Sequence, residues 1–147
     1  MNNKTSLTLS LILMDGADTI LFKNKEDKHE FLSTNIEEGV PLLEVLVREC
    51  AKIGILVDFN EIEFLGCVDV NTNNHINLLF RSRYFEGNPI LKDNNKYTDL
   101  VKRKFTLLYD FPSGLSPDTI RYLIMLRQSR NFKFYTGEEY LPDKITG

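Results

Sequence analysis

With 147 residues, 42% of them hydrophobic, the chain can bury one sizeable core, and we expect a single domain over residues 1–147, with its core at about 5–133 and a C-terminal tail at 134–147. The formal net charge of −3 and the pI of about 5.4 argue against a protein drawn as a whole to nucleic acid or to an anionic membrane. No stretch approaches the roughly 18 to 20 apolar residues of a membrane span, so we expect a cytoplasmic protein without a membrane partner.

The two cysteines, Cys50 and Cys67, are not in a CxxC or other metal-ligand spacing. We therefore expect two reduced, buried thiols rather than a metal site. The apolar run at residues 7–14 is short and ends at Asp15-Gly16 without a small-residue cleavage pattern, so it does not indicate a secretory signal.

The first predicted element is a β-strand at residues 6–14, where hydrophobic and polar positions alternate. One side would carry Leu7, Leu9, Leu11 and Leu13, and the other Thr8, Ser10 and Ile12. Turn residues at 15–18 and apolar residues at 19–22 then predict a hairpin. Residues 23–30 are charged at nearly every position, which predicts a solvated loop with His29 at the surface.

Residues 41–54 predict an amphipathic helix, with Pro41 at its first position and Gly54 just past its end. Its apolar stripe would consist of Leu42, Leu43, Leu46, Val47, Cys50 and Ile53. On another face, Glu44 and Arg48 are four residues apart and can form an ion pair worth roughly a few tenths of a kcal/mol.

The second half of the chain predicts a further hairpin and a second helix. Residues 61–70 and 75–85 are strand-like and are separated by the turn residues 71–74. A polar loop at 92–99 and a short strand at 105–109 follow. Ser116 is expected to cap the last helix, with Pro117 at its first position, and residues 135–147 to dock loosely.

This order of elements resembles the Nudix (MutT-like) hydrolase superfamily over roughly residues 5–133. Local phrases are similar too: FLSTNIEEG, LVREC, YFEGNP and KFTLLYDFP. The resemblance implies an α+β or α/β fold in which a mixed β-sheet is sandwiched between helices.

The family's chemistry explains its characteristic box. Diphosphate hydrolysis needs divalent cations to neutralise phosphate charge and to help generate hydroxide, and Mg²⁺ takes several oxygen ligands in octahedral geometry. A helix with the pattern Glu-x-x-Glu-Glu presents carboxylates at i, i+3 and i+4 on one face. The preceding glycine loop lets the backbone approach metal and phosphate. The resemblance therefore implies a Mg²⁺ or Mn²⁺ cofactor if the chain is active.

The present chain keeps only part of that box. Arg48 and Glu49 match the family's arginine and first glutamate and would be the catalytic residues of a vestigial box. The paired glycines of the loop fall at Thr34 and Asn35, and the acid after the glycine turn falls at Val40.

The two adjacent glutamates of the family are also missing. They fall on Lys52 and Ile53 or on a deletion, because the segment between Glu49 and Gly54 is one residue shorter than the pattern. No register restores two adjacent acids. The positive charge of Lys52 would oppose Mg²⁺ binding.

Other residues could complete a weak site. Asp93 lies in the loop from which many Nudix hydrolases draw a further carboxylate, so Glu49 and Asp93 could together hold one metal ion. Glu37 and Glu38, in the turn before the helix, could face the same cleft. The resemblance places the ligand beside the box helix, and the candidate substrate-binding side chains are Phe31, Phe80 and Tyr84.

Three functions fit these observations, and the sequence leaves open whether the chain is an enzyme. The first is a Nudix-fold protein with a degenerate box that binds a nucleotide or a nucleoside-diphosphate-linked ligand without efficient hydrolysis. The second is a metal-dependent nucleoside-diphosphate-X pyrophosphohydrolase with an atypical or weak metal site. The third is a structural or protein-interaction domain. The resemblance also implies a possible homodimer.

Nucleic-acid binding is a further alternative. Lys102-Arg103-Lys104 lies close in sequence to two further cations, Lys92 and Lys96, and to the aromatic residues Tyr97 and Phe105. Basic residues beside aromatic ones can hold a phosphate backbone and stack on bases. The acidic total charge argues against such a partner.

Overall fold

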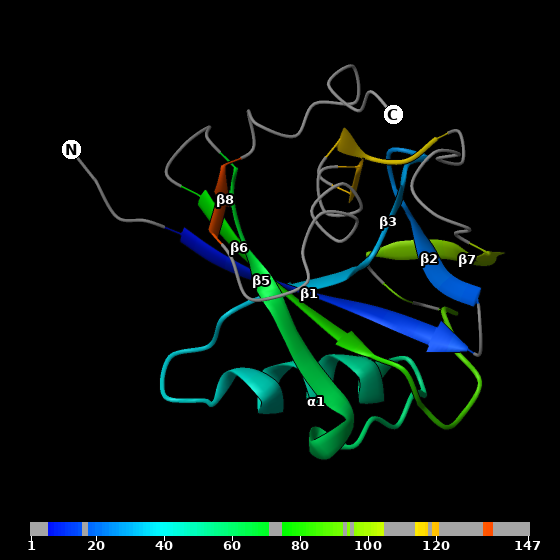
Figure 1. The fold of residues 1–147 in the computed structure, drawn as a ribbon. Helices are drawn as coiled ribbons and strands as arrows, with labels where there is room; N and C mark the ends of the chain where they lie inside the picture. Colours follow the sequence, from blue (N-terminus) through cyan, green and yellow to red (C-terminus); the bar gives the residue numbers. More distant parts are fainter. Residues whose placement is uncertain are drawn as a thin grey trace.

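The computed structural model describes residues 6–15, 18–70, 75–92, 94, 96–104, 114–117, 119, 120 and 134–136. Within them, the elements in chain order are β1 (Ser6–Asp15), β2 (Asp18–Asn24), β3 (His29–Glu30), β4 (Leu32–Asn35), α1 (Leu42–Lys52), the 3-10 helix η1 (Phe59–Glu61), β5 (Ile62–Val70), β6 (His75–Ser82), β7 (Tyr97–Lys104) and β8 (Phe134–Thr136). Residues 117, 119 and 120 are also helical. The strands form an eight-stranded mixed sheet of an α+β fold (Figure 1).

The long strand β1 is central to this sheet. It runs parallel to β6 over residues 6–13 and antiparallel to β4 over residues 8–11, and it turns into β2 through Met14 and Asp15. On the far side of β6 lie β5 and then β8, while β3 and β7 both pair with β2. The two predicted hairpins, β1 with β2 and β5 with β6, are therefore confirmed.

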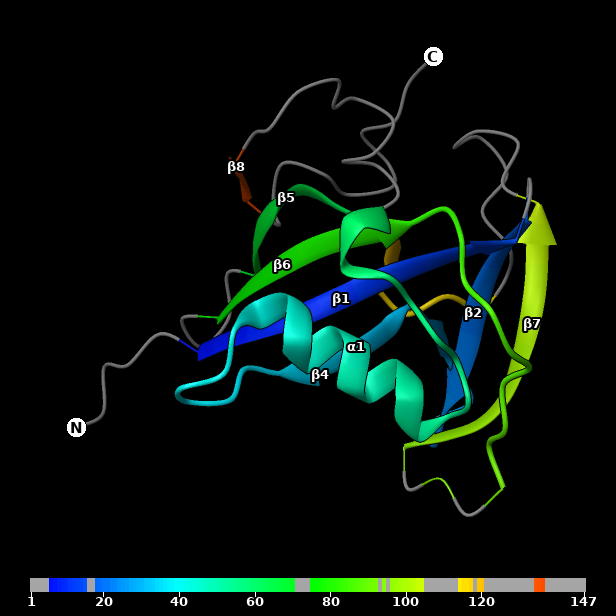
Figure 2. The ribbon, with the colours of Figure 1, turned by 90° about the horizontal axis from the view of Figure 1, so that it is seen from below.

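The predicted alternation of β1 is also confirmed, and it separates two cores. The core on one face joins β1 to α1 and contains Leu9, Leu11, Leu13, Val45, Leu46 and Cys50. The core on the other face contains Ile12, Leu21, Phe31, Val68, Leu79 and Leu115. Figure 2 shows α1 lying across β1 and β4, with β2 and β7 side by side at the C-terminal end of β1. Thr8 and Ser10 belong to the face that α1 does not cover.

The boundaries of α1 follow local backbone chemistry. Pro41 is the residue before the helix rather than its first position. Gly54 has a φ of +80°, and its N–H donates to the Ala51 carbonyl at 3.1 Å, while the Ile55 N–H donates to the Cys50 carbonyl at 2.9 Å. This pair of bonds is a Schellman motif, so the predicted role of Gly54 as helix terminator is confirmed. Among the described residues no helix, α1 included, is long and apolar enough to cross a membrane.

Three predicted irregular regions contain strands. The expected loop at 23–30 is partly wrong, because β2 continues to Asn24 and β3 pairs back with it. The expected polar loop at 92–99 is interrupted by β7, which pairs with β2. The expected tail from residue 134 begins with β8. β7 and β8 pair with strands far away in sequence, so their own residues did not reveal them. β3 pairs locally with β2, but its two residues, His29 and Glu30, are polar and too few to show an alternation.

The second predicted helix is described only at its start. The Ser116 Oγ accepts a hydrogen bond from the Thr119 N–H at 3.2 Å, and the Ile120 N–H donates to the Ser116 carbonyl at 3.1 Å. The predicted cap at Ser116 is therefore confirmed. The predicted strand at 105–109 lies outside the described residues.

Both cysteines are buried and free, as expected. Burial raises the pKa of the Cys50 thiol to about 12, and the negative charge of Glu49 adds to this rise. Burial likewise raises the pKa of Cys67. Both thiols therefore stay protonated at neutral pH and act as small apolar side chains.

Candidate functional site

Glu49, which the sequence comparison matches to the first glutamate of the family's box, is paired with a neighbouring lysine. Its side chain is 24% exposed, and the Lys52 Nζ donates to its Oε1 at 2.8 Å from the next turn of α1. This hydrogen bond and the charge of Glu49 raise the pKa of Lys52. Where the family pattern has a second carboxylate, this helix therefore presents an ammonium group that binds the first carboxylate.

Arg48, the other box residue, joins α1 to the turn before it. One of its guanidinium nitrogens donates to Glu44 Oε1 at 3.2 Å, and the other lies 4.0 Å from Glu37 Oε1. The predicted pair of Glu44 and Arg48 is thus confirmed. Because these side chains are about half exposed, such pairs are worth only about 0–1 kcal/mol each.

A second ammonium group, that of Lys96, interacts electrostatically with the same acid. Its Nζ donates to the Ser33 carbonyl oxygen of β4 and lies 5.4 Å from the centre of the Tyr97 ring. Desolvation of this ammonium lowers the pKa of Lys96, whereas the charges of Glu30 and Glu49 act to raise it. The positive charge of Lys52 also lowers the pKa of Lys96. We call these four interacting residues the charge cluster: Glu30, Glu49, Lys52 and Lys96.

The segment that carries Lys96 is fixed against β4. The buried Tyr97 hydroxyl accepts a hydrogen bond from the Ser33 N–H at 2.8 Å, and the Tyr97 ring centre lies 4.9 Å from that of Phe22. The Asn94 Oδ1 accepts from the backbone N–H groups of Lys96 and Tyr97, both at 2.8 Å. Burial raises the pKa of Tyr97, so its hydroxyl stays neutral. The Lys96 ammonium is therefore held in place before any ligand binds.

The charge cluster does not fit a divalent metal ion. Mg²⁺ prefers several oxygen ligands, and no group of three His, Cys, Asp or Glu side chains in the described part of the chain lies close enough to hold a metal. Two ammonium groups beside the carboxylates would repel the ion. Asp93, the predicted partner of Glu49, lies outside the described residues, so this metal pair stays a prediction.

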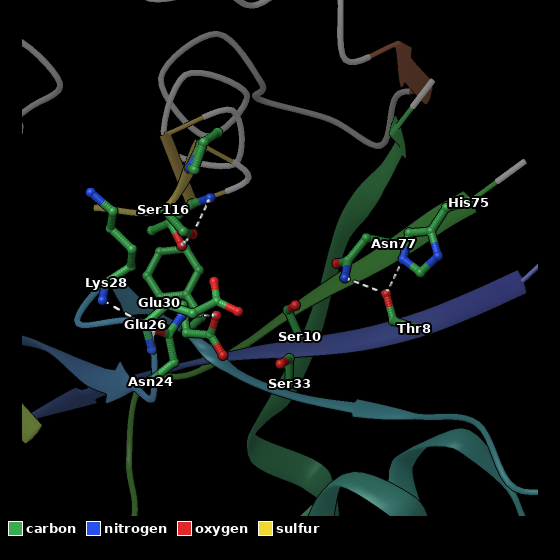
Figure 3. A pocket seen from close by; sticks show the side chains of 13 residues that line it. Thr8, Ser10, Asn24, Glu26, Lys28, Glu30, Ser33, His75, Asn77 and Ser116 are labelled. Atoms are coloured by element: carbon green, nitrogen blue, oxygen red, sulfur yellow. Dashed lines mark hydrogen bonds between the residues drawn. The ribbon is translucent and has the colours of Figure 1, made fainter. Parts of the chain in front are cut away.

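A polar pocket of about 450 Å³ lies on the sheet face that α1 does not cover (Figure 3). Short polar side chains of three adjacent strands line it: Thr8, Ser10, Ser33, His75 and Asn77. Other lining residues come from the β2–β3 segment and from the start of the last helix: Asn24, Glu26, Lys28, Glu30, Ser116 and Thr119. Glu30 also belongs to the charge cluster, and Ser33 contacts it through its carbonyl. The polar pocket therefore shares Glu30 with the charge cluster and approaches Lys96 at Ser33 of β4, whereas Glu49 and Lys52 lie on α1, which covers the other face of the sheet.

A chain of hydrogen bonds links the adjacent strands β6 and β1 along one wall of the polar pocket. The Asn77 Nδ2 donates to Thr8 Oγ1 at 2.7 Å, Thr8 Oγ1 lies 2.8 Å from His75 Nε2, and His75 Nδ1 lies 2.7 Å from Ser6 Oγ. Sequence reasoning missed Asn77 because it lies in an otherwise apolar stretch. The signal that could have found it is the alternation of β1, since a partly buried polar side chain such as Thr8 needs a hydrogen-bond partner on an adjacent strand.

The three predicted substrate-binding aromatics do not lie together. Phe31 lines the polar pocket, with 1% of its surface exposed. Phe80 faces the other side of the sheet, where it lines an apolar groove beside the start of α1 and lies 5.1 Å from the Phe64 ring centre. Tyr84 lines neither of these two pockets; it is 54% exposed and donates to Glu86 Oε1 at 2.8 Å. Their roles in binding remain predictions.

The basic run behind the nucleic-acid alternative lies in β7. There the Lys102 Nζ donates to the Asp15 Oδ2 at 2.6 Å, and this contact raises the pKa of Lys102. One of the five cations on which that alternative rests, Lys102, is therefore engaged by an acid. Phe105 lies outside the described residues.

No protein-family model and no curated protein matches this sequence. Solved structures do match its fold. The MutT Nudix hydrolase from Burkholderia pseudomallei matches with a TM-score of 0.70 and 16% identity, over 86% of this chain and 99% of that one. An ADP-ribose pyrophosphatase from Streptococcus suis matches with a TM-score of 0.55 and 9% identity, over 90% and 99% of the two chains. A MutT protein from Bacillus halodurans matches with a TM-score of 0.58 and 16% identity, over 92% and 94%. The chain therefore has the Nudix fold that its sequence predicted.

Proposed function

We propose that this chain binds a nucleotide or a nucleoside-diphosphate-linked ligand without hydrolysing it efficiently. The observation that carries the proposal is the charge cluster, in which the Lys52 ammonium bonds to Glu49, and the charge of Glu49 also acts on the Lys96 ammonium held at the Ser33 carbonyl. Lysine ammonium groups bind phosphate as point charges, and they disfavour the divalent ion that diphosphate hydrolysis needs. In this proposal Arg48 and Glu49 have no catalytic role and form ion pairs with neighbouring side chains.

Lys52, Lys96 and Glu49 of the charge cluster have distinct tasks in this proposal. Lys52 and Lys96 neutralise the phosphate oxygens. Glu49 orients the Lys52 ammonium through their 2.8 Å bond, and the Ser33 carbonyl orients that of Lys96. Neutralised phosphate binds tightly, but two ammonium groups do not supply the metal-activated water of the hydrolases. Binding is therefore retained where rapid hydrolysis is lost.

The polar pocket would take the part of the ligand that is not phosphate. Its volume of about 450 Å³ falls in the usual range for small-molecule sites, roughly 300–1,000 Å³. It adjoins the charge cluster at Glu30 and Ser33, so one ligand could reach both. One structure with the same fold is an ADP-ribose pyrophosphatase, which supports an ADP-containing probe.

The test is a calorimetric titration of the full chain with ADP, once with EDTA and once with Mg²⁺. We expect the Kd in EDTA to equal the Kd in Mg²⁺ or to be lower, because the protein supplies its own cations and bound Mg²⁺ reduces the charge of ADP. We also expect the Kd to rise with salt concentration. Binding that requires Mg²⁺ would favour the metal-dependent hydrolase instead, and heat in neither buffer would favour an interaction domain.

A further inference from the structure

The side chain of Asn77 has an unused hydrogen-bond acceptor inside the polar pocket. Asn77 is 3% exposed, and its Oδ1 has no hydrogen-bond partner among the described residues. Buried polar atoms in folded proteins nearly always have a partner, because burying one without a hydrogen bond costs free energy. An acceptor left open in a pocket wall indicates that a ligand supplies the donor.

In this structure the two ends of the carboxamide have different surroundings. The Nδ2 end donates to Thr8 Oγ1, which also lies within hydrogen-bond distance of His75, and His75 in turn of Ser6. Turning the amide over would replace this 2.7 Å bond by one from the Thr8 hydroxyl to Oδ1 and would present a donor to the pocket, so a preference for carbonyl-bearing bases would indicate that orientation. Figure 3 shows the carboxamide oxygen turned away from Thr8, towards the interior of the pocket.

The surroundings of Asn77 favour a ligand group that is uncharged and rich in donors. Two carboxylates, Glu26 and Glu30, and one ammonium group, Lys28, line the same pocket, so its net charge disfavours phosphate, which the ammonium groups of the charge cluster attract instead. The hydroxyl groups of Ser10 and Ser33 can accept or donate, so they fit a heterocycle with several polar edges.

We propose that Asn77 determines specificity by accepting a hydrogen bond from the exocyclic amino group of a nucleobase. This inference rests on the proposed function, nucleotide binding. Adenine and cytosine carry such an amino group. In hypoxanthine and uracil a carbonyl oxygen takes its place, and that oxygen would face the Asn77 oxygen with no proton between them. Asparagine reads the adenine amino group through the same carboxamide oxygen in DNA-binding proteins.

The test compares two nucleotide pairs, ADP with IDP and CDP with UDP, by calorimetric titration of the full chain in EDTA. We expect the amino-bearing member of at least one pair to bind roughly tenfold or more tightly than its partner. Asn77→Leu should reduce that ratio to about two or less, because leucine has similar size but no acceptor. Asn77→Asp should keep the preference, since a carboxylate also accepts from an amino group.

Two controls separate specificity from damage to the fold. Asn60→Leu, at an exposed position that does not line the polar pocket, should keep the wild-type ratio. A melting temperature close to that of the wild type should accompany each variant. Equal binding within both pairs in the wild type would overturn this inference and leave the proposed function intact. A preference that survives Asn77→Leu would also overturn it, and binding of none of the four nucleotides would overturn both proposals.

Discussion

Replacing Lys96 by methionine is expected to weaken ADP binding roughly tenfold to hundredfold, as measured by calorimetry in EDTA. Methionine keeps an unbranched, flexible stem and removes the ammonium group. A hydrogen bond to a charged group contributes about 1.5–3 kcal/mol, which gives that range. The contribution of Lys96 should lie towards the upper end, because Ser33 and Asn94 already hold the residue in position and little side-chain entropy is lost on binding.

Lys92→Met is the matched control for this variant. Lys92 lies four residues away, is exposed and loses the same charge when it is replaced. We expect it to change the Kd by about twofold or less, because Lys92, which is exposed as Lys96 is, does not belong to the charge cluster and contributes only screened, long-range attraction. Equal losses in the two variants would show that phosphate responds to overall charge and not to the charge cluster.

Replacing Gly87 by alanine is expected to lower the free energy of unfolding by about 3 kcal/mol or more. Gly87 has a φ of +99°, and a Cβ there would lie 2.3 Å from the carbonyl oxygen of Gly54. Both backbones are held by reciprocal bonds between Leu56 and Glu86, at 2.8 and 2.9 Å, so neither can move away without losing them. Backbone strain of about 1–3 kcal/mol therefore adds to the cost of separating two packed segments. Urea unfolding at equilibrium measures the loss.

Gly39→Ala provides the comparison for this stability change. Gly39 also has a positive φ, +80°, but no atom lies within 4 Å of where its Cβ would be. Its replacement should cost only about 1–2 kcal/mol of backbone strain. The difference between the two variants isolates the contact that fixes the chain just beyond α1. If both variants lost the same free energy, the close approach of Gly87 to Gly54 would not be a feature of the folded chain.

Sequence patterns predicted those parts of the fold that local chemistry determines. The alternation from Leu7 to Leu13 predicted β1 and both of its faces, because strand side chains alternate with a period of two. The left-handed conformation needed after α1 explains why Gly54 was recognisable as its terminator. The hydroxyl of Ser116 likewise revealed the start of the last helix.

The remaining features depend on contacts between residues far apart in sequence. Strand β4 is the polar tetrapeptide LSTN, and only its pairing with β1 makes it a strand. Lys96 reaches the charge cluster because Tyr97, in a strand paired with β2, is anchored on Ser33. Whether the Asn77 oxygen has a hydrogen-bond partner depends on which residues share its face of the sheet, among them Thr8 on the neighbouring strand β1. None of these relations has a periodicity or a spacing that a single sequence displays.

A turnover assay tests most sharply whether the chain binds nucleotide without hydrolysing it. The full chain, at a nucleotide concentration that saturates binding, is assayed for product release with Mg²⁺ and with Mn²⁺. ADP-ribose and a nucleoside triphosphate serve as substrates. Because the charge cluster offers ammonium groups in place of metal ligands, we predict saturable binding with a turnover below about 0.01 s⁻¹, whereas enzymes commonly reach about 1–1,000 s⁻¹. Metal-dependent turnover of about 1 s⁻¹ or more would show instead that the chain is an efficient hydrolase.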